Sequence, residues 1–315
     1  MSRTGLILCL GTTPAAQRVM IFRRLTLDAV NRAVTTLDGA AGKSVNVAKV
    51  LRVLGERPLA AGFLGGDRGD YLREVLDRRG IETDFVRVEA RTRQCVTVID
   101  ESSSTVTELV EESRPVAPEA FAELLARVER RLPACRAVVM SGTITPGGPV
   151  DLYRRVAEWA RSRGLLAVVD AQGVPLIESL PAGPDLVKPN RTELAATVGR
   201  ELPDEASVVE AIRELAARGA RRVVVTAGAA ATLAFDGSRC WRIVPPTAKA
   251  VNPIGSGDAF TAGVTARLLA GDDLGEACRW GVAAGTANAL TAMAGEVELD
   301  EVKRLAAEAT VEEVS

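Results

Sequence analysis

Residues 251–263 read Val-Asn-Pro-Ile-Gly-Ser-Gly-Asp-Ala-Phe-Thr-Ala-Gly and lead directly into an apolar helical segment. Gly255 and Gly257, on either side of Ser256, let backbone amides converge on an anion at the start of that helix. Asp258 follows at once. A carboxylate there repels an anionic ligand, so its position makes chemical sense if it removes a hydroxyl proton where an oxyanion develops. The structural alternative is an aspartate favoured by the helix dipole.

Strand-like and helix-like segments alternate along the rest of the chain. The strand-like runs are residues 5–10, 59–64, 137–140, 165–169 and 222–226, and the helical ones are residues 44–54, 71–79, 150–162 and 207–218. Strands that alternate with helices of this length indicate right-handed βαβ crossovers. The sequence therefore predicts an α/β protein with a mostly parallel sheet that carries helices on both faces.

Two extended segments interrupt this alternation, at residues 18–38 and 85–110. The second contains two strand candidates around the turn-rich residues 100–104, which is typical of a hairpin. We expect both segments to form a small second sheet. Because ligands of open α/β folds bind outside the carboxyl ends of the strands, this sheet is expected to act as a lid over that edge. The chain after residue 298 is expected to form a terminal helix with a frayed end at residues 312–315.

Composition excludes several classes of function. The 315 residues contain 39 basic and 41 acidic side chains, a balance that argues against a nucleic-acid-binding protein. No histidine is present, which excludes every mechanism that needs an imidazole and leaves proton transfer to a carboxylate, Lys, Tyr or Cys. No stretch approaches the ~20 apolar residues of a membrane span. The five scattered cysteines form no CxxC motif and indicate reduced thiols in the cytoplasm.

A second candidate motif is Ala-Ala-Gly-Lys-Ser-Val-Asn-Val-Ala at residues 40–48. It is not a Walker A loop, which needs a glycine where this chain has Leu37. What remains is a turn at Gly42 with Lys43 and Asn46 at the opening of a helix. These groups suit the phosphate and hydroxyls of a substrate. A capped helix with a solvated lysine fits the same residues.

A third motif, Lys-Pro-Asn-Arg-Thr-Glu at residues 188–193, follows a short strand. Asn190 is a good N-cap and Glu193 falls at the N3 position, which together predict a capping box. The functional interpretation is a carboxylate that holds Mg²⁺ through water, with the amide near a phosphate.

Three weaker signals complete the set. The glycine-rich residues 65–69 lack the GxGxxG spacing of a dinucleotide loop, and we expect a turn there. Strand alternation places Arg91 and Arg93 on one face, as an anion clamp or as a solvated pair. Thr226 and Gly228 lie in a strand-end loop that is suited to contact a nucleotide.

Taken in this order, the motifs resemble those of the PfkB (ribokinase-like) family of carbohydrate kinases over roughly residues 6–309. VNPIGSGDAFTAG is similar to the family's C-terminal signature, and AAGKSVNVAKVL followed by FLGGDRG is similar to its N-terminal one. The segment LVKPNRTEL is similar to the corresponding segment in the branch of the family that includes 1-phosphofructokinase and tagatose-6-phosphate kinase. The resemblance implies a Rossmann-type three-layer α/β/α sandwich with a small β-sheet lid. It also implies one ribokinase-like domain over residues 1–315, with lid strands inserted at about 12–40 and 85–112.

The resemblance implies ATP-dependent phosphoryl transfer to a hydroxyl of a ketohexose phosphate, with Mg²⁺, and a homodimer formed through the lid. Asp258 would be the general base, and the Gly255–Gly257 amides would form the anion hole. The implied substrate-binding residues are Gln17, Gly42, Lys43, Asn46, Arg91 and Arg93; the nucleotide-binding residues are Lys188, Asn190, Thr226, Gly228 and Asn288; the metal-binding residue is Glu193.

The chain departs from the family pattern at several positions, among them Thr13, which replaces a usual asparagine. Gln17 replaces a usual aspartate, Ala231 replaces a usual glycine, and Cys95 stands where some members have asparagine. These changes fall on sugar-reading and nucleotide-loop positions, whereas the phosphotransfer motif is intact. Two alternatives therefore stay open: a kinase of an unphosphorylated sugar or nucleoside, and a sugar-phosphate or nucleotide sensor without catalysis. A dehydrogenase is excluded because the first strand has no GxGxxG fingerprint after it.

Overall fold

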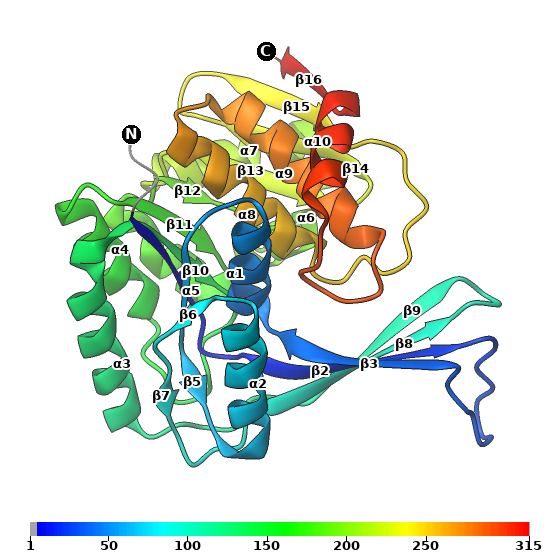
Figure 1. Ribbon diagram of the computed structural model, residues 1–315. Helices are drawn as coiled ribbons and strands as arrows, with labels where there is room; N and C mark the ends of the chain where they lie inside the picture. Colours follow the sequence, from blue (N-terminus) through cyan, green and yellow to red (C-terminus); the bar gives the residue numbers. More distant parts are fainter. Residues whose placement is uncertain (1–4, 315) are drawn as a thin grey trace.

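The computed structural model describes residues 5–314, which form three sheets with helices packed around the largest of them (Figure 1). The ten-stranded sheet has the order β16 (Thr310–Val314), β15 (Cys240–Val244), β14 (Ala230–Phe235), β13 (Val223–Ala227), β12 (Leu186–Val187), β11 (Leu166–Asp170), β10 (Cys135–Ser141), β1 (Leu6–Leu10), β4 (Pro58–Ala61) and β6 (Glu82–Thr83). The helices are α1 (Lys43–Val53), α2 (Gly66–Arg78), α3 (Pro118–Arg131), α4 (Leu152–Ser162), α5 (Gly173–Ser179), α6 (Arg191–Val198), α7 (Glu205–Ala217), α8 (Ser256–Ala270), α9 (Leu274–Ala289) and α10 (Leu299–Glu308), with short 3-10 turns at Leu132–Ala134 and Leu180–Ala182.

The large sheet is parallel from β13 to β6 and antiparallel from β13 to β16. The first strand, β1, lies between β10 and β4. The chain continues from β1 to β4 and β6 on one side and then returns to β10 on the other side, so the strand order reverses at β1. A crevice at the carboxyl ends of the strands is expected at such a reversal.

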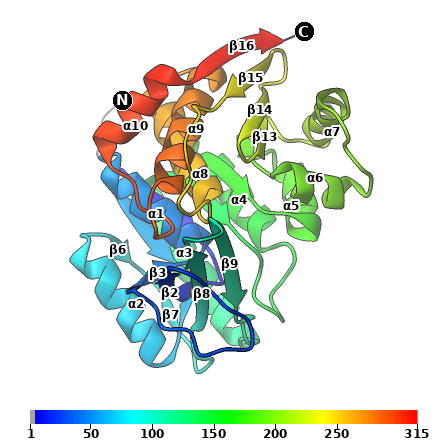
Figure 2. The same cartoon turned by 90° about the vertical axis from the view of Figure 1, so that its right-hand side faces the viewer.

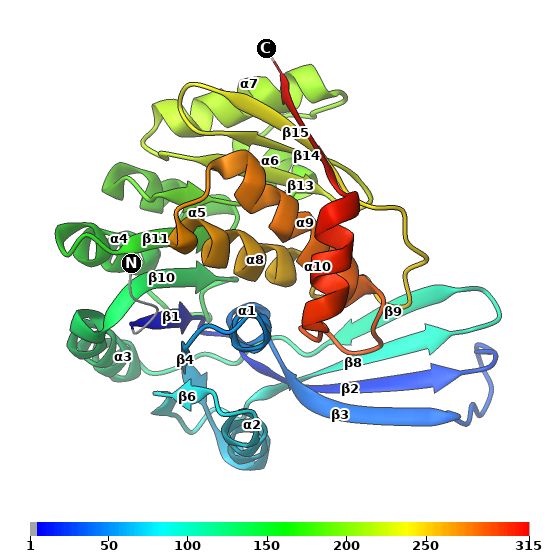
Figure 3. The same cartoon turned by 45° about the horizontal axis from the view of Figure 1, so that its top comes forward.

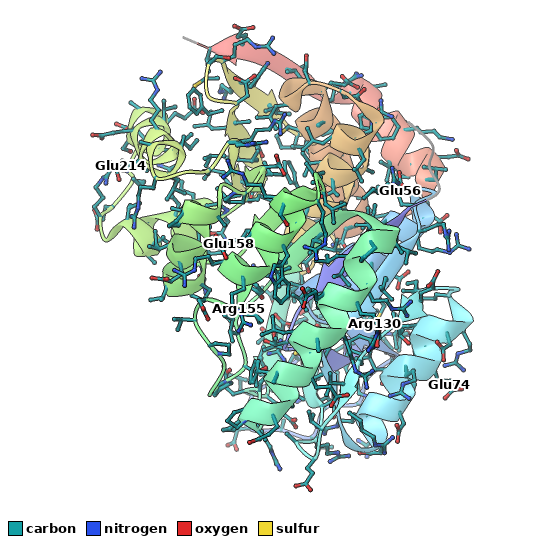
Figure 4. All side chains as sticks on the ribbon, turned by 90° about the vertical axis from the view of Figure 1, so that its left-hand side faces the viewer. Glu56, Glu74, Arg130, Arg155, Glu158 and Glu214 are labelled. Carbon is teal, nitrogen blue, oxygen red and sulfur yellow. The ribbon has the colours of Figure 1, made fainter. Side chains whose placement is uncertain are left out.

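Helices cover both faces of the sheet, as the alternating pattern predicts (Figure 3). Successive residues of β1 belong to opposite cores: Ile7 and Cys9 face one apolar cluster, whereas Leu8 and Leu10 face the other. The first cluster includes residues of α1, α2, α8, α9 and α10, and the second includes residues of α3, α4, α5 and α7. On the second side, Arg130 of α3 and Glu158 of α4 are exposed to solvent (Figure 4). The predicted three-layer α/β/α arrangement is confirmed.

The two interrupting segments meet in a separate four-stranded sheet of order β3 (Thr35–Ala41), β2 (Ala15–Phe22), β8 (Arg93–Asp100) and β9 (Thr105–Val110). β2 pairs in parallel with β8, whereas β2–β3 and β8–β9 are antiparallel. This small sheet projects from the main body (Figures 1 and 2).

Three details differ from the sequence-based expectation. The strand predicted at residues 59–64 is divided at Gly62 into β4 and β5 (Phe63–Leu64), and β5 pairs with β7 (Val86–Arg87) in a two-stranded sheet. A Cβ on Gly62 would lie 1.9 Å from the Gly11 carbonyl oxygen, so only glycine allows the chain to change sheets there.

The glycine-rich residues 65–69 are not a simple turn, because α2 begins at Gly66. The chain after α10 is not frayed, because residues 310–314 form β16 on β15, with all five residues in register. Ser315 lies outside the described residues. The prediction of a frayed end was wrong because the charged residues Glu312 and Glu313 belong to an exposed edge strand. Charged side chains are common on such strands.

All five cysteines are buried and none is in a disulfide. Within residues 5–314, no helix is both long enough and apolar enough to cross a membrane.

The hydroxyl of Tyr153 supports the edge of the sheet where the crevice lies. Tyr153, fully buried on α4, donates toward the carbonyl oxygens of Ser141 at 3.2 Å and Gly142 at 3.0 Å. We expect Tyr153→Phe to lower the free energy of unfolding in urea by about 1–2 kcal/mol, because it leaves a buried carbonyl without a donor. Tyr71→Phe, on a partly exposed residue of α2, is the control and should change stability by less than about 0.5 kcal/mol. Equal effects would contradict the assigned role.

Candidate active site

A cavity of about 670 Å³ lies where the large and small sheets meet. Its walls come from the small sheet, the N-terminal turns of α1 and α8, the loop before α8, and the loops that follow β12 and β13. The lining residues from the sequence motifs are Gln17, Gly42, Lys43, Asn46, Arg93, Lys188, Asn190, Glu193, Thr226, Gly228, Gly255, Ser256, Gly257 and Asp258.

The turn before α8 is fixed by side chains of buried asparagines. Gly255 is the N-cap with φ +85°, and a Cβ there would lie 2.9 Å from the Ala294 Cβ, so both backbone and space require glycine. The Asn252 Oδ1 accepts from the Ile254 amide at 3.0 Å, and the Asn288 Nδ2 donates to the Ile254 carbonyl at 2.9 Å. The amide end of α8 therefore opens into the cavity in one conformation, which suits an anion.

Asp258 lies in the first turn of α8 and is only 6% exposed. The Asn46 Nδ2 donates to its Oδ2 at 2.7 Å. Burial, together with the nearby Asp170 carboxylate, raises the pKa of Asp258 to about 7, against the opposing effect of Lys43. A carboxyl group with a pKa near neutrality is suited to accept a proton from a substrate hydroxyl.

Two lysines meet at the carboxylate of Asp170, which is fully buried at the end of β11. The Lys43 Nζ lies 3.4 Å from its Oδ1, the Lys188 Nζ lies 3.3 Å from its Oδ2, and the Thr261 hydroxyl donates to Oδ2 at 2.7 Å. Burial alone would raise the pKa of Asp170, but Lys188 and Lys43 hold it below its usual value. The carboxylate therefore stays charged and fixes both ammonium groups at the cavity wall.

The capping box predicted at the start of α6 is present. The Asn190 Oδ1 accepts from the Glu193 amide at 2.8 Å, and the Glu193 Oε2 accepts from the Asn190 amide at 2.9 Å. The other carboxylate oxygen, Oε1, accepts from the Lys43 Nζ at 3.0 Å. Burial opposes a high pKa at Lys43, yet Asp170 and Glu193 raise it above its usual value. The structural and functional interpretations of Glu193 are thus compatible.

The small sheet supplies the opposite wall of the cavity. The Arg93 guanidinium donates to the Thr13 carbonyl oxygen at 3.0 and 3.2 Å, which holds the cation at the cavity rim. Gln17 is 2% exposed, and its Oε1 has no hydrogen-bond partner among residues 5–314. The Asn46 Oδ1 is also buried without a hydrogen-bond partner among these residues. Buried acceptors without a donor are costly, so a ligand that brings hydroxyl donors would satisfy them.

Two of the residues predicted for the site do not line this cavity. Arg91 lies outside, in an exposed ion pair with Asp67 at 2.7 Å. Strand alternation does not apply to it, because β8 begins only at Arg93. Asn288 is fully buried, and its Nδ2 donates to the Ile254 carbonyl in the turn before α8.

The sequence reading missed Asp170 and Glu108. Asp170 follows the apolar run at residues 165–169 directly, and a carboxylate at the carboxyl end of a central strand was an available signal. Glu108 lines the cavity from β9. Burial raises its pKa, while the Arg93 cation opposes that effect. No motif marks Glu108, since only the sheet register brings it opposite Thr97.

Comparisons with known proteins identify the family and the fold. A family model described as pfkB family carbohydrate kinase matches residues 6–299. A Thermotoga maritima protein described as a possible 1-phosphofructokinase has a TM-score of 0.91 at 26% identity, over 98% of this chain and 100% of its own. Phosphofructokinase-2 from Escherichia coli has a TM-score of 0.87 at 28% identity, over 96% and 98%. Arabidopsis thaliana ribokinase, at 20% identity and a TM-score of 0.75 over 96% and 98%, shares the fold.

The raised pKa of Asp258 predicts a cost in stability. An unfolded aspartate titrates near pH 4 and the folded one near 7, so stability falls as pH rises through this window. Asp258→Asn cannot ionise and keeps the volume. We expect it to exceed the wild type at pH 8 by about 1–3 kcal/mol in urea unfolding, and to match it near pH 4. Asp77→Asn, on the exposed side of α2, should show no such pH-dependent difference. A variant less stable than the wild type at pH 8 would contradict this account.

Proposed function

The chain belongs to the pfkB family of carbohydrate kinases, and from this premise we propose that it transfers the γ-phosphoryl group of ATP to a hydroxyl of a ketohexose phosphate. The observation that carries the proposal is the buried Asp258, with a pKa near 7, directly after the glycine turn at the start of α8. A base beside an anion-binding helix end is what transfer to a hydroxyl group requires.

The proposed mechanism depends on positioning and charge. Asp258 accepts the proton of the attacking hydroxyl through the carboxylate that Asn46 orients. The amides of residues 255–257 stabilise negative charge on the transferred group. Lys43 adds a cation whose place is fixed by Asp170 and Glu193. None of these steps needs an imidazole, which is consistent with a chain that has no histidine.

We assign the nucleotide to the part of the cavity lined by Lys188, Asn190, Thr226 and Gly228. The first two lie between β12 and α6, Thr226 lies near the end of β13, and Gly228 lies in the turn between β13 and β14. These segments end at the carboxyl edge of the parallel strands, where nucleotides bind in open α/β folds. Asn288 supports this region indirectly through the turn that it braces.

Magnesium fits the same region. Residues 5–314 contain no cluster of three or more candidate ligands that would enclose a metal ion. Mg²⁺ commonly takes only one or two protein carboxylates and keeps waters and phosphate oxygens as its other ligands. Glu193, at the cavity wall beside Lys43, is the residue we assign to it. The bound ion would neutralise charge on the nucleotide phosphates.

Arg93 is the main argument for an acceptor that is already phosphorylated. It lies on the small sheet, which faces the acceptor end of the cavity, and its guanidinium suits a phosphate dianion. One Escherichia coli phosphofructokinase-2 structure is a complex with fructose-6-phosphate. Gln17, with an unpartnered amide oxygen where relatives usually have aspartate, points to an altered pattern of hydroxyl recognition rather than a lost reaction. An unphosphorylated sugar remains the second candidate acceptor.

The proposed enzyme works as one domain over residues 1–315, with the small sheet as its lid. Leu109 of β9 is 56% exposed, and Leu27 and Val30 in the loop that joins β2 to β3 are 86% and 84% exposed. A second copy of the chain packed on this sheet would cover them, which supports a homodimer through the lid. The buried, unpaired thiols suit a reducing compartment, and we place the enzyme in the cytoplasm on that ground.

The direct test is an ADP-release screen over phosphorylated and free sugars, with Asp258→Asn as the matched inactive variant. We expect a ketohexose phosphate to be the best acceptor. Asp258→Asn should lower turnover by about 10²–10⁴-fold, the usual contribution of a general base, while nucleotide affinity changes little. Turnover within threefold of wild type would remove Asp258 from the mechanism. Absence of turnover with every acceptor would favour the alternative that the protein is a non-catalytic sensor of a sugar phosphate or nucleotide.

The phosphate assignment is tested by a pair of arginine variants. Arg93→Ala should raise the KM for the sugar phosphate by roughly 10–150-fold, the value of one charge-assisted contact, and leave the nucleotide KM near wild type. Arg91→Ala is the control, because Arg91 pairs with Asp67 outside the cavity, and both KM values should stay within about twofold. A rise confined to the nucleotide KM in Arg93→Ala would overturn the assignment.

A further inference from the structure

A fully buried lysine behind the cavity has no part in the mechanism above. Lys49 lies on α1 and is 2% exposed. Its Nζ donates to the carbonyl oxygens of Ala40 at 3.0 Å and Ala294 at 2.6 Å, and it lies 3.1 Å from Oε1 of Glu296. An ammonium group has three protons to donate, and three acceptors surround this one. The surroundings therefore fit the charged form, although burial lowers the pKa of Lys49 against the effect of Glu296.

The contacts of Lys49 join three segments that frame the cavity. Ala40 belongs to the last residues of β3, just before Ala41 and Gly42 reach the cavity wall. Ala294 packs against the Gly255 turn, where an added Cβ would come within 2.9 Å of its own. Lys49 itself lies on the helix that begins at the cavity. The Lys49 side chain thus connects α1 with the end of β3 and with the Ala294 loop that packs against the anion-binding turn.

The same helix carries the partner of the proposed base. Asn46 lies one turn before Lys49 on α1 and donates to Asp258. Gly295, the neighbour of Ala294, packs closely on Asn46, since an added Cβ would lie 2.9 Å from the Asn46 Cα. A displacement of this loop or of α1 would therefore move the amide that orients the Asp258 carboxylate.

The charge of Lys49 also reaches Asp258, because the carboxylate raises the pKa of this lysine. The interaction is reciprocal, so the cation must favour the ionised form of Asp258. Around Asp258 the other charged groups are Asp170 of β11, Lys43 of α1 and Lys188. Lys49 is faced by Glu296 and by Arg79, the C-cap residue of α2.

We propose that Lys49 is a positioning residue of the phosphotransfer site, which holds the anion-binding turn and Asn46 in place relative to the small sheet. Its charge acts on Asp258 in addition to this positioning. The inference rests on the proposed function for its kinetic readout only. Lys49 does not line the cavity, so its loss should affect kcat and the pKa of Asp258 more than the binding of either ligand.

The test compares Lys49→Met and Lys49→Gln with Lys49→Arg. The two neutral variants should lower kcat by at least about tenfold, as small misplacements of reacting groups do, with both KM values within about threefold. They should also move the acidic limb of the kcat/KM profile to higher pH by about 0.5–1 unit, because a cation near Asp258 is lost. Lys49→Arg keeps the charge and should keep the limb at its wild-type pH.

The control is Lys303→Met, which removes an exposed charge on α10 and should change nothing. A neutral variant that folds, turns over within twofold of wild type and keeps the wild-type limb would overturn the inference. If neither neutral variant folds, Lys49→Arg decides, because a displaced limb in a charge-conserving variant would overturn it.

A second measurement separates this inference from the proposed function. The carboxyl resonance of Asp258 can be titrated by ¹³C NMR in aspartate-labelled protein, with Asp258→Asn to assign the signal. The neutral Lys49 variants should raise the observed pKa whether or not an acceptor has been found. Protein without kinase activity that still shows this shift would refute the proposed function and support the role of Lys49. An active enzyme whose neutral Lys49 variants show no change in the pKa of Asp258 would support the proposed function and refute the role of Lys49.

Discussion

The carboxylate of Asp170 is the interaction on which the architecture of the site depends. It brings together Lys43 from α1, Lys188 from the loop after β12, and Thr261 from α8, three segments that are remote in sequence. A fully buried charge is tolerable only because it is paired and hydrogen-bonded on both oxygens. Removing one partner from such a cluster typically costs about 3–5 kcal/mol of folding free energy. The two lysines and the carboxylate therefore depend on one another for stability.

The same crowding of charge explains why Asp258 and Asp170 differ in acidity. Both are buried aspartates, but Asp170 faces two ammonium groups, whereas the hydrogen-bond donor of Asp258 is the neutral amide of Asn46. Their pKa values are consequently displaced in opposite directions. A pair of like groups whose environments separate their acidities is a recurrent way to obtain one fixed charge and one titrating group in a single site.

The sequence predicted those parts of the structure that local patterns encode. The helix start at Ser256, the capping box of Asn190 and Glu193, and the strand-helix alternation all depend on residues a few positions apart. Predictions that needed tertiary context were less successful. Strand alternation was applied to Arg91, but β8 begins only at Arg93. Asp170 was overlooked because its role depends on lysines that only the folded chain brings close to it. Glu108 reaches the cavity only through the register of β8 and β9.

The small sheet has a consequence for how the molecule is assembled. Its central pairing sets Ala15 beside Arg93 in parallel, so the sheet cannot close until the chain between them, including α1, β4 and α2, has been laid down. Contacts of such long sequence separation form late because loop closure must precede them. The pairing of β2 with β8 should thus acquire protection later than the β8–β9 hairpin in pulse-labelling hydrogen exchange. A chain in which β2 and β8 have not yet paired would lack the wall of the cavity that carries Gln17 and Arg93.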